Sequence, residues 1–204
     1  NESFKNEYLN ENFWFSIEGA DLNDIPESIL TVPFILNVAP IVWASGRKVR
    51  IKKIDKNLSL ALVSIKAEMK KMYPSLSWSG EIEAEEHTAT DMNSIDNVAC
   101  VLFSGGLDSV TTSYRYLKQK QVLVTVRGSD VKLSDDKGWN NVTLAVEEYS
   151  KQLDGITCFV ESNFVEFVNH RVMNNITDAI PSWWAYVQHG LGLSGLMAVP
   201  SYLN

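Results

Sequence analysis

Two hydrophobic patterns alternate along the second half of the chain. Short runs in which nearly every residue is apolar occupy 98–103, 122–126 and 156–160, and such runs are typical of strands covered on both faces. Between them, apolar residues recur at spacings of three and four over 107–117 and 142–153, as on one buried face of a helix. We expect the first helix to bury Leu107, Val110, Tyr114 and Leu117. Strands that alternate with helices predict an α/β fold around a parallel sheet, with ligands beyond the carboxyl ends of its strands.

The first half of the chain contains weaker strand patterns. Residues 46–54 alternate, with Val49 and Ile51 on one face and basic side chains on the other, as expected of a half-buried strand. Residues 13–17 and 76–82 are further predicted strands.

Helix patterns lie between these strands. The mostly apolar stretch 26–43 contains Pro33 and Pro40, which we expect to break it into short helices. The clearest helix follows, with Asn57 as its predicted cap and Pro74 as its stop. The first half is therefore expected to form a small α/β unit.

A polar segment rich in turn-forming residues, 87–97, separates the two halves. We interpret it as a linker. The predicted domains are 1–97 and 98–204, and we expect the second to be incomplete at its C-terminus.

Length and composition limit the classes of protein to which the chain can belong. The 204 residues suit one or two domains, and no run approaches the ~18 apolar residues of a membrane span. We therefore expect a cytoplasmic protein without membrane contact. The formal net charge of −7 argues against a nucleic-acid partner. Cys100 and Cys158 lie in apolar runs, which indicates buried, reduced thiols.

The chemistry is concentrated where the run 98–103 meets the string Ser104 to Ser109, Ser-Gly-Gly-Leu-Asp-Ser. Its two glycines allow strained backbone angles and a close approach to a ligand. The helix expected from about Leu107 adds unpaired N–H donors and the positive end of its dipole. This order of strand, small-residue turn and helix predicts an anion site. The alternative is a tight turn in which Asp108 and Ser109 only cap the helix.

A P-loop would need Lys followed by Ser or Thr after the last Gly, and this string lacks that pair. The string resembles instead the PP-loop of the ATP pyrophosphatases (adenine nucleotide alpha hydrolase-like proteins), whose nucleotide-binding domain is Rossmann-type and HUP-like. This superfamily includes asparagine and GMP synthetases and 7-cyano-7-deazaguanine synthase. In it the loop grips the departing pyrophosphate while a substrate oxygen attacks the α-phosphorus, which gives an adenylated intermediate.

The resemblance implies ATP and Mg²⁺ as cofactors and a ligase that adenylates a small carboxylate and passes it to an amine. It assigns Asp108 and Ser109 to catalysis and Asp108 to magnesium. The implied nucleotide-binding residues are Phe103, Ser104, Gly105, Gly106, Leu107, Asp108 and Ser109.

Two further segments are candidates for the same site. In the related synthases, the turn after the second strand lines the pocket, and here it contains Arg127, Gly128, Asp130 and Lys132. Arg127 or Lys132 would neutralise a phosphate, and Asp130 would hold a ribose or magnesium. Arg127 and Gly128 are thus candidate nucleotide contacts, and Asp130 and Lys132 are candidate substrate contacts. The alternative is a solvated surface loop.

The second segment follows Pro181 and contains Trp183, Trp184, His189 and Gly190. Paired tryptophans stack well on a purine-like base, and His189 is a candidate phosphate contact or acid. The alternative is that the tryptophans fill the core and the histidine is structural. The deazaguanine synthases carry Pro-Gly-Arg-Asn about here and four zinc-binding cysteines near their end. This chain has Gln-His-Gly and no such cluster, so zinc is not expected.

The layout of a small α/β unit before the loop resembles the deazaguanine-synthase-like proteins of bacterial anti-phage defence operons. The resemblance implies a deazapurine-like carboxylate and an acceptor or protein partner from the same operon. Two alternatives stay open: a tRNA-modifying PP-loop enzyme that uses the basic residues of 47–56, and a catalytically inactive nucleotide-binding subunit. Those basic residues, and the glutamates within 81–86, are otherwise expected to be solvated strand faces.

Overall fold

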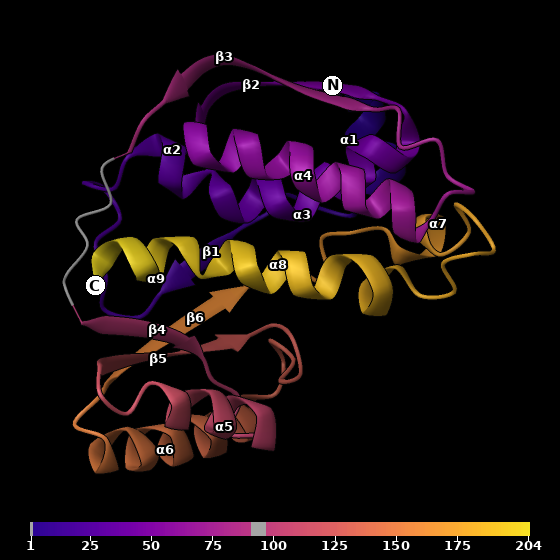
Figure 1. Ribbon diagram of the computed structural model, residues 1–204. Helices are drawn as coiled ribbons and strands as arrows, with labels where there is room; N and C mark the ends of the chain where they lie inside the picture. The colour runs from indigo at the N-terminus through magenta and orange to yellow at the C-terminus, as the bar shows by residue number, and fades with distance from the viewer. Residues whose placement is uncertain (1, 91–96) are drawn as a thin grey trace. The chain divides into compact units, whose positions relative to one another are not determined.

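The computed structural model describes residues 2–90 and 97–204 and has the expected α/β class (Figure 1). Its larger sheet has four strands in the order β1 (Phe15–Ile17), β6 (Ile156–Ser162), β5 (Lys120–Arg127) and β4 (Val98–Leu102). β4, β5 and β6 run parallel, whereas the short β1 is antiparallel to β6. The mostly parallel sheet predicted from the sequence is confirmed.

The chain forms two compact units, each built from separated segments. The first comprises Asn1–Asn12, Asp24–Asp91 and Glu166–Ala198, and the second comprises Phe13–Asn23, Met92–Val165 and Val199–Asn204. This grouping is interleaved along the sequence, whereas the predicted domains are contiguous. It assigns 166–198 to the first unit, and β1 joins the second because it pairs with β6.

In the second unit, two helices cover one face of the sheet. These are α5 (Leu107–Arg115) and α6 (Asp136–Gln152), which lie beneath β4 and β5 in Figure 1. The core between sheet and helices consists of Ala99, Val101, Phe103, Leu123, Trp139, Val146 and Phe159. Pro200 of α9 (Ala198–Leu203) lies close to Cys100 of β4.

The predicted buried face of α5 is wrong for three of its four residues, whereas Val110 packs against the core. Leu107, Tyr114 and Leu117 are 82%, 62% and 50% exposed, whereas Ser113 is fully buried. The Ser113 hydroxyl donates to Gln121 Oε1 at 2.6 Å, and the Gln121 amide donates to the Ser113 carbonyl at 3.0 Å. Because this buried polar pair is fully satisfied, Ser113 can face the sheet in place of an apolar side chain.

In the first unit, a crossover connects two parallel strands. β2 (Lys48–Asp55) is followed by α4 (Lys56–Met72) and then by β3 (Glu81–Thr88), which pairs with β2. The alternation predicted for β2 is confirmed, with Val49 and Ile51 less exposed than their neighbours. β3 includes the first two residues of the expected linker, and residues 91–96 lie outside the described part of the chain.

Six further elements complete the fold of the described residues. They are α1 (Glu2–Tyr8), α2 (Glu27–Leu30), α3 (Val32–Ser45), α7 (His170–Met173), the π-helical turn η1 (Trp184–Gln188) and α8 (His189–Leu196). Among the described residues, no helix is long and apolar enough to cross a membrane.

The prediction that prolines break the stretch 26–43 is wrong for most of its length, because α3 runs unbroken past Pro40. Pro33 lies in the first turn, where its missing N–H would be unpaired in any case. An interior proline costs about 3 kcal/mol. Burial offsets this cost, since nearly every residue of α3 is buried and each large apolar side chain contributes roughly 1.5–3 kcal/mol.

The strand predicted at 76–82 is also wrong, since β3 begins only at Glu81. Trp78 is fully buried with a φ of 47°, and its indole N–H donates to the Tyr73 carbonyl at 2.9 Å. A Cβ on Gly80 would lie 1.8 Å from the Val42 carbonyl oxygen. These residues therefore form a turn packed against the end of α3.

The N-cap of α4 is Asp55 and not the predicted Asn57. The Asp55 carboxylate accepts hydrogen bonds from the backbone N–H groups of Asn57 and Leu58, at 2.8 and 3.0 Å. The helix thus begins two residues earlier than the sequence pattern indicates.

Substitution of Asp55 and of Asn57 tests which of the two residues caps α4. We expect Asp55→Ala to lower the free energy of unfolding by about 1 kcal/mol, because it leaves helix N–H groups unpaired. Asn57→Ala, a matched control, should change it by less than about 0.5 kcal/mol. Urea denaturation of both variants checks this, and a larger loss for Asn57→Ala would contradict the Asp55 cap.

Candidate functional site

The loop between β4 and α5 is held at its start by the sheet. Phe103 is buried, its N–H donates to the Val124 carbonyl at 2.8 Å, and its carbonyl accepts from the Thr125 hydroxyl at 2.7 Å. The chain then turns through exposed residues, with Gly105 at a φ of 78°. Only glycine adopts this angle readily. The predicted turn from strand to helix is confirmed, with α5 beginning at Leu107.

Gly106 precedes α5 and has no packing reason to be glycine. Its φ is −76°, and an added Cβ would meet only the Ser104 hydroxyl, at 3.4 Å. The first hydrogen bond of the helix runs from the N–H of Val110 to the Gly106 carbonyl. The N–H groups of residues 107–109 therefore have no partner within the helix. Open space in front of unpaired donors is the geometry that accommodates an anion.

The polar side chains of the loop are placed around this space. Ser109 donates to the Gly106 carbonyl at 2.8 Å, and the Ser104 hydroxyl accepts from the Gly106 N–H at 3.4 Å. Asp108 is exposed in the first turn of α5. The structure therefore brings the two serine hydroxyls of the predicted loop to Gly106.

The donor set fits magnesium only in part. No cluster of three or more His, Cys, Asp or Glu side chains occurs among the described residues. Mg²⁺ usually takes one or two carboxylates, substrate phosphates and several waters. Asp108 would be the carboxylate here, and bound phosphates would supply most of the remaining ligands.

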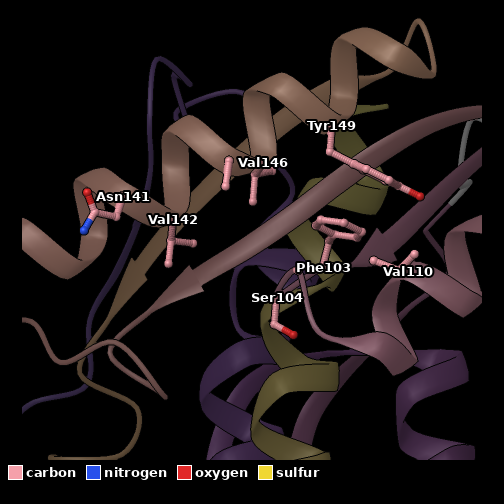
Figure 2. Close-up of a pocket in the computed structure, with 9 residues that line it drawn as sticks. Phe103, Ser104, Val110, Asn141, Val142, Val146 and Tyr149 are labelled. Atoms are coloured by element: carbon pink, nitrogen blue, oxygen red, sulfur yellow. The ribbon is translucent and has the colours of Figure 1, made fainter.

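A pocket of about 380 Å³ adjoins the loop, between α5 and α6 (Figure 2). Phe103, Ser104 and Gly105 form the side next to the loop, and the rest of the lining is Val110, Asn141, Val142, Ala145, Val146 and Tyr149. The rings of Phe103 and Tyr149 are stacked with centroids 4.8 Å apart. The loop thus borders a largely apolar cavity large enough for a small ligand.

Arg127 is not free to neutralise a phosphate. Its guanidinium forms ion pairs with Asp136 and, at 3.0 Å, with Glu161, and it donates to the Leu133 carbonyl at 2.7 Å. The hydrogen bond to Asp136 raises the pKa of Arg127 most, burial lowers it, and the bond to Glu161 raises it further. Arg127 is thus a charged anchor that holds residues 128–136 against the end of the sheet.

The rest of this turn divides into a packed and an exposed part. Gly128 has a φ of 101°, and an added Cβ would lie 1.8 Å from the Ser162 carbonyl oxygen. This close approach accounts for the glycine without a ligand. Asp130 and Lys132 are exposed, and their predicted substrate contacts stay predictions.

The segment around the paired tryptophans belongs to the first unit, whereas the loop belongs to the second. Trp183 has no exposed surface, so neither face of its indole is open to a base. Trp184 is partly exposed and contacts the exposed His189 edge to face, with centroids 4.9 Å apart. Gly190 is exposed. Substrate binding by Trp184, His189 and Gly190 stays a prediction.

The basic residues of β2 are paired with the glutamates of β3. Lys48 lies 2.6 Å from Glu81, and Arg50 lies 3.2 Å from Glu83. Their hydrogen bonds raise the pKa of Lys48 and lower that of Glu81. The charges of Lys48 and Arg50 are thus balanced across the strands, as expected of a solvated face.

Neither cysteine has the surroundings of a reactive thiol. Burial raises the pKa of Cys158 to about 11 and also raises that of Cys100. Because the thiolate is the nucleophilic form, both side chains are poor nucleophiles near neutral pH.

The sequence pattern does not reveal that α6 lines the pocket. The spacing of Val142 and Tyr149 predicts a helix face, but nothing in that spacing indicates that this face also borders the loop. Tyr149 lies over Phe103 (Figure 2), and its hydroxyl donates to the Ser113 hydroxyl at 3.3 Å. The signal was weak, because an amphipathic face looks the same whether it lines a core or a pocket.

The chain matches no family model, no curated protein and no solved structure. The geometry and chemistry of the loop and pocket therefore carry the functional argument.

Substitution of Gly106 and Gly128 tests which of these two glycines the stability of the fold requires. Gly128→Ala should lower the free energy of unfolding by roughly 2–4 kcal/mol, because the new Cβ collides with backbone at a positive φ. Gly106→Ala should change it by less than about 0.5 kcal/mol, because the space beside it is open. Urea denaturation followed by tryptophan fluorescence measures both. Equal losses would show that Gly106 is kept for packing.

Proposed function

We propose that the second unit binds ATP with its phosphates on the loop 104–109 and activates a carboxylate with release of pyrophosphate. The observation that carries this proposal is the open space beside Gly106, the residue immediately before the unpaired N–H groups at the start of α5. A turn that only connected strand to helix would have no need of glycine there. The likeness of the string to a PP-loop supports ATP as the anion.

The charge at the loop favours pyrophosphate as the leaving group. The loop has no lysine, and the nearby Arg127 is already paired with two carboxylates. Phosphate would therefore be held by backbone N–H groups, with Mg²⁺ at Asp108 supplying the missing positive charge. This differs from a P-loop, in which a lysine reaches the β- and γ-phosphates.

The proposed reaction has two steps. A carboxylate oxygen attacks the α-phosphorus, and the bond from that phosphorus to the bridging oxygen of the β-phosphate breaks, which releases pyrophosphate and leaves an acyl adenylate. An amine then attacks the acyl carbon, loses a proton and displaces AMP. The donors of residues 105–109 would stabilise the charge that develops on the leaving oxygens.

The apolar pocket supports this chemistry because an acyl adenylate is destroyed by water. Val142, Val146 and Tyr149 give it a wall of low polarity beside the loop, and exclusion of water protects a reactive intermediate. The deazapurine-like carboxylate, and a role in anti-phage defence, rest on the resemblance alone.

RNA modification, the alternative that relied on the basic residues of 47–56, gains no support from β2. The charges of Lys48 and Arg50 are balanced by glutamates, and nucleic-acid binding depends on unbalanced positive charge.

The reaction can be followed with ATP, Mg²⁺, 7-carboxy-7-deazaguanine as the candidate acid and ammonia as the amine. We expect AMP and pyrophosphate in equal amounts, and an adenylated acid if the amine is omitted. Gly106→Val should lower the rate roughly 10- to 100-fold, since its side chain would cover the donors. Asp108→Ala should raise the magnesium concentration needed for half-maximal rate.

Thr111→Val is the matched control, because it alters α5 one turn beyond the donors and should leave the rate unchanged. Formation of ADP would contradict the reaction class, and equal ATP affinity of the wild type and Gly106→Val would contradict the site. Binding of ATP without pyrophosphate release for any acid would favour the inactive-subunit alternative.

A further inference from the structure

β3 is a long strand with one free edge. It has eight residues and pairs with β2 along one side, and no other strand pairs with it among the residues that the structure describes. Half of the backbone N–H and C=O groups of an edge strand point away from its neighbour and are open to pairing.

The charges on these strands form two parallel rows. On one face Lys48 and Arg50 of β2 pair with Glu81 and Glu83 of β3, and on the other face Lys53 pairs with Glu86. Glu85 takes part in no ion pair among the described residues. A strand added beside β3 would meet the acidic row first. Opposite charges across neighbouring strands stabilise a sheet, and like charges destabilise it.

β3 also borders a second pocket of about 380 Å³. Ile82 and Ala84 line it from β3 together with Glu81, Glu83 and His87, and its apolar lining is completed by Trp43, Ile54, Leu62 and Val63. Val63 and the neighbouring Leu60 are 69% and 63% exposed, so apolar surface of α4 is left uncovered beside the pocket. Lys66 donates to the Gly80 carbonyl at 2.6 Å at the start of the strand.

We propose that β3 is a docking edge for an extended segment of a partner protein in which lysine or arginine alternates with apolar residues. Successive side chains of a strand point to opposite faces. The basic side chains of the added strand lie over Glu83 and Glu85, and its apolar side chains enter the pocket beside Ala84 and Val63. Backbone hydrogen bonds to the free edge supply the rest of the affinity.

The same charges argue against a second copy of this chain as the occupant. If two β3 strands paired edge to edge, the acidic rows of both copies would lie next to each other. Such like-charge neighbours are unfavourable, whereas a basic strand continues the alternation of rows that begins at β2.

The test uses a fluorescein-labelled nonapeptide of alternating lysine and valine, titrated with the whole protein at physiological salt. We expect saturable binding by fluorescence anisotropy, and at least tenfold weaker binding of the glutamate and valine version. N-methylation of every second residue should weaken binding at least tenfold for one of the two alternate sets and little for the other. Only pairing along a single edge gives that asymmetry.

Substitutions in the protein test whether the peptide binds along the free edge of β3. Glu85→Lys should weaken binding about three- to tenfold and Val63→Asp at least as much, whereas Glu68→Lys, on the part of α4 away from the pocket, should leave it unchanged. Equal binding of acidic and basic peptides, or no effect of either methylated set, would overturn the proposal. So would a wild-type dimer that Glu85→Lys converts to a monomer, since a second copy would then be the occupant.

Discussion

The pairing of β4 with β5 is the constraint on which the candidate site depends. It fixes Phe103 at the last rung of the ladder, where the Val124 carbonyl and the Thr125 hydroxyl bind its backbone. The chain must then leave the sheet and enter α5 within three residues. A turn this short at the carboxyl end of a strand leaves the first N–H groups of the helix pointing outward, next to the pocket that α6 completes. The position of the donors is therefore a consequence of sheet pairing and not of the loop alone.

The turns after β4 and β5 both follow a parallel strand of the sheet, but the space around their glycines differs. After β5, Arg127 binds Asp136 and Glu161, and Gly128 packs against the backbone of β6. The space in that turn is therefore filled by protein atoms. After β4, no side chain fills the space beside Gly106, so this turn is open. The contrast explains why two glycine-containing segments that look equally suited to phosphate in the sequence have different surroundings.

Elements whose sequence pattern reflects their own burial were predicted correctly. Features that depend on one specific side chain elsewhere in the chain were not. The apolar runs of β4, β5 and β6 predicted the strands of the sheet and the start of α5, because short runs without polar alternation are typical of parallel strands. Leu102 at the end of β4 is nevertheless 37% exposed. The exposed face of α5 was missed because Ser113 reaches a buried partner, Gln121, that spacing does not reveal. Pro40 was misjudged because the burial of α3 outweighs the cost of one missing hydrogen bond. Arg127 was treated as a ligand because its two carboxylate partners lie 9 and 34 residues away.

The central claim is that backbone N–H groups at the start of α5 bind phosphate. The most direct measurement is a titration of ¹⁵N-labelled protein with magnesium pyrophosphate, followed by two-dimensional NMR of the backbone amides. The amide signals of residues 105–109 should shift most and saturate together, while the closed turn at Gly128 changes little. Saturable shifts centred on another segment, or no saturable shift in residues 105–109, would contradict the account.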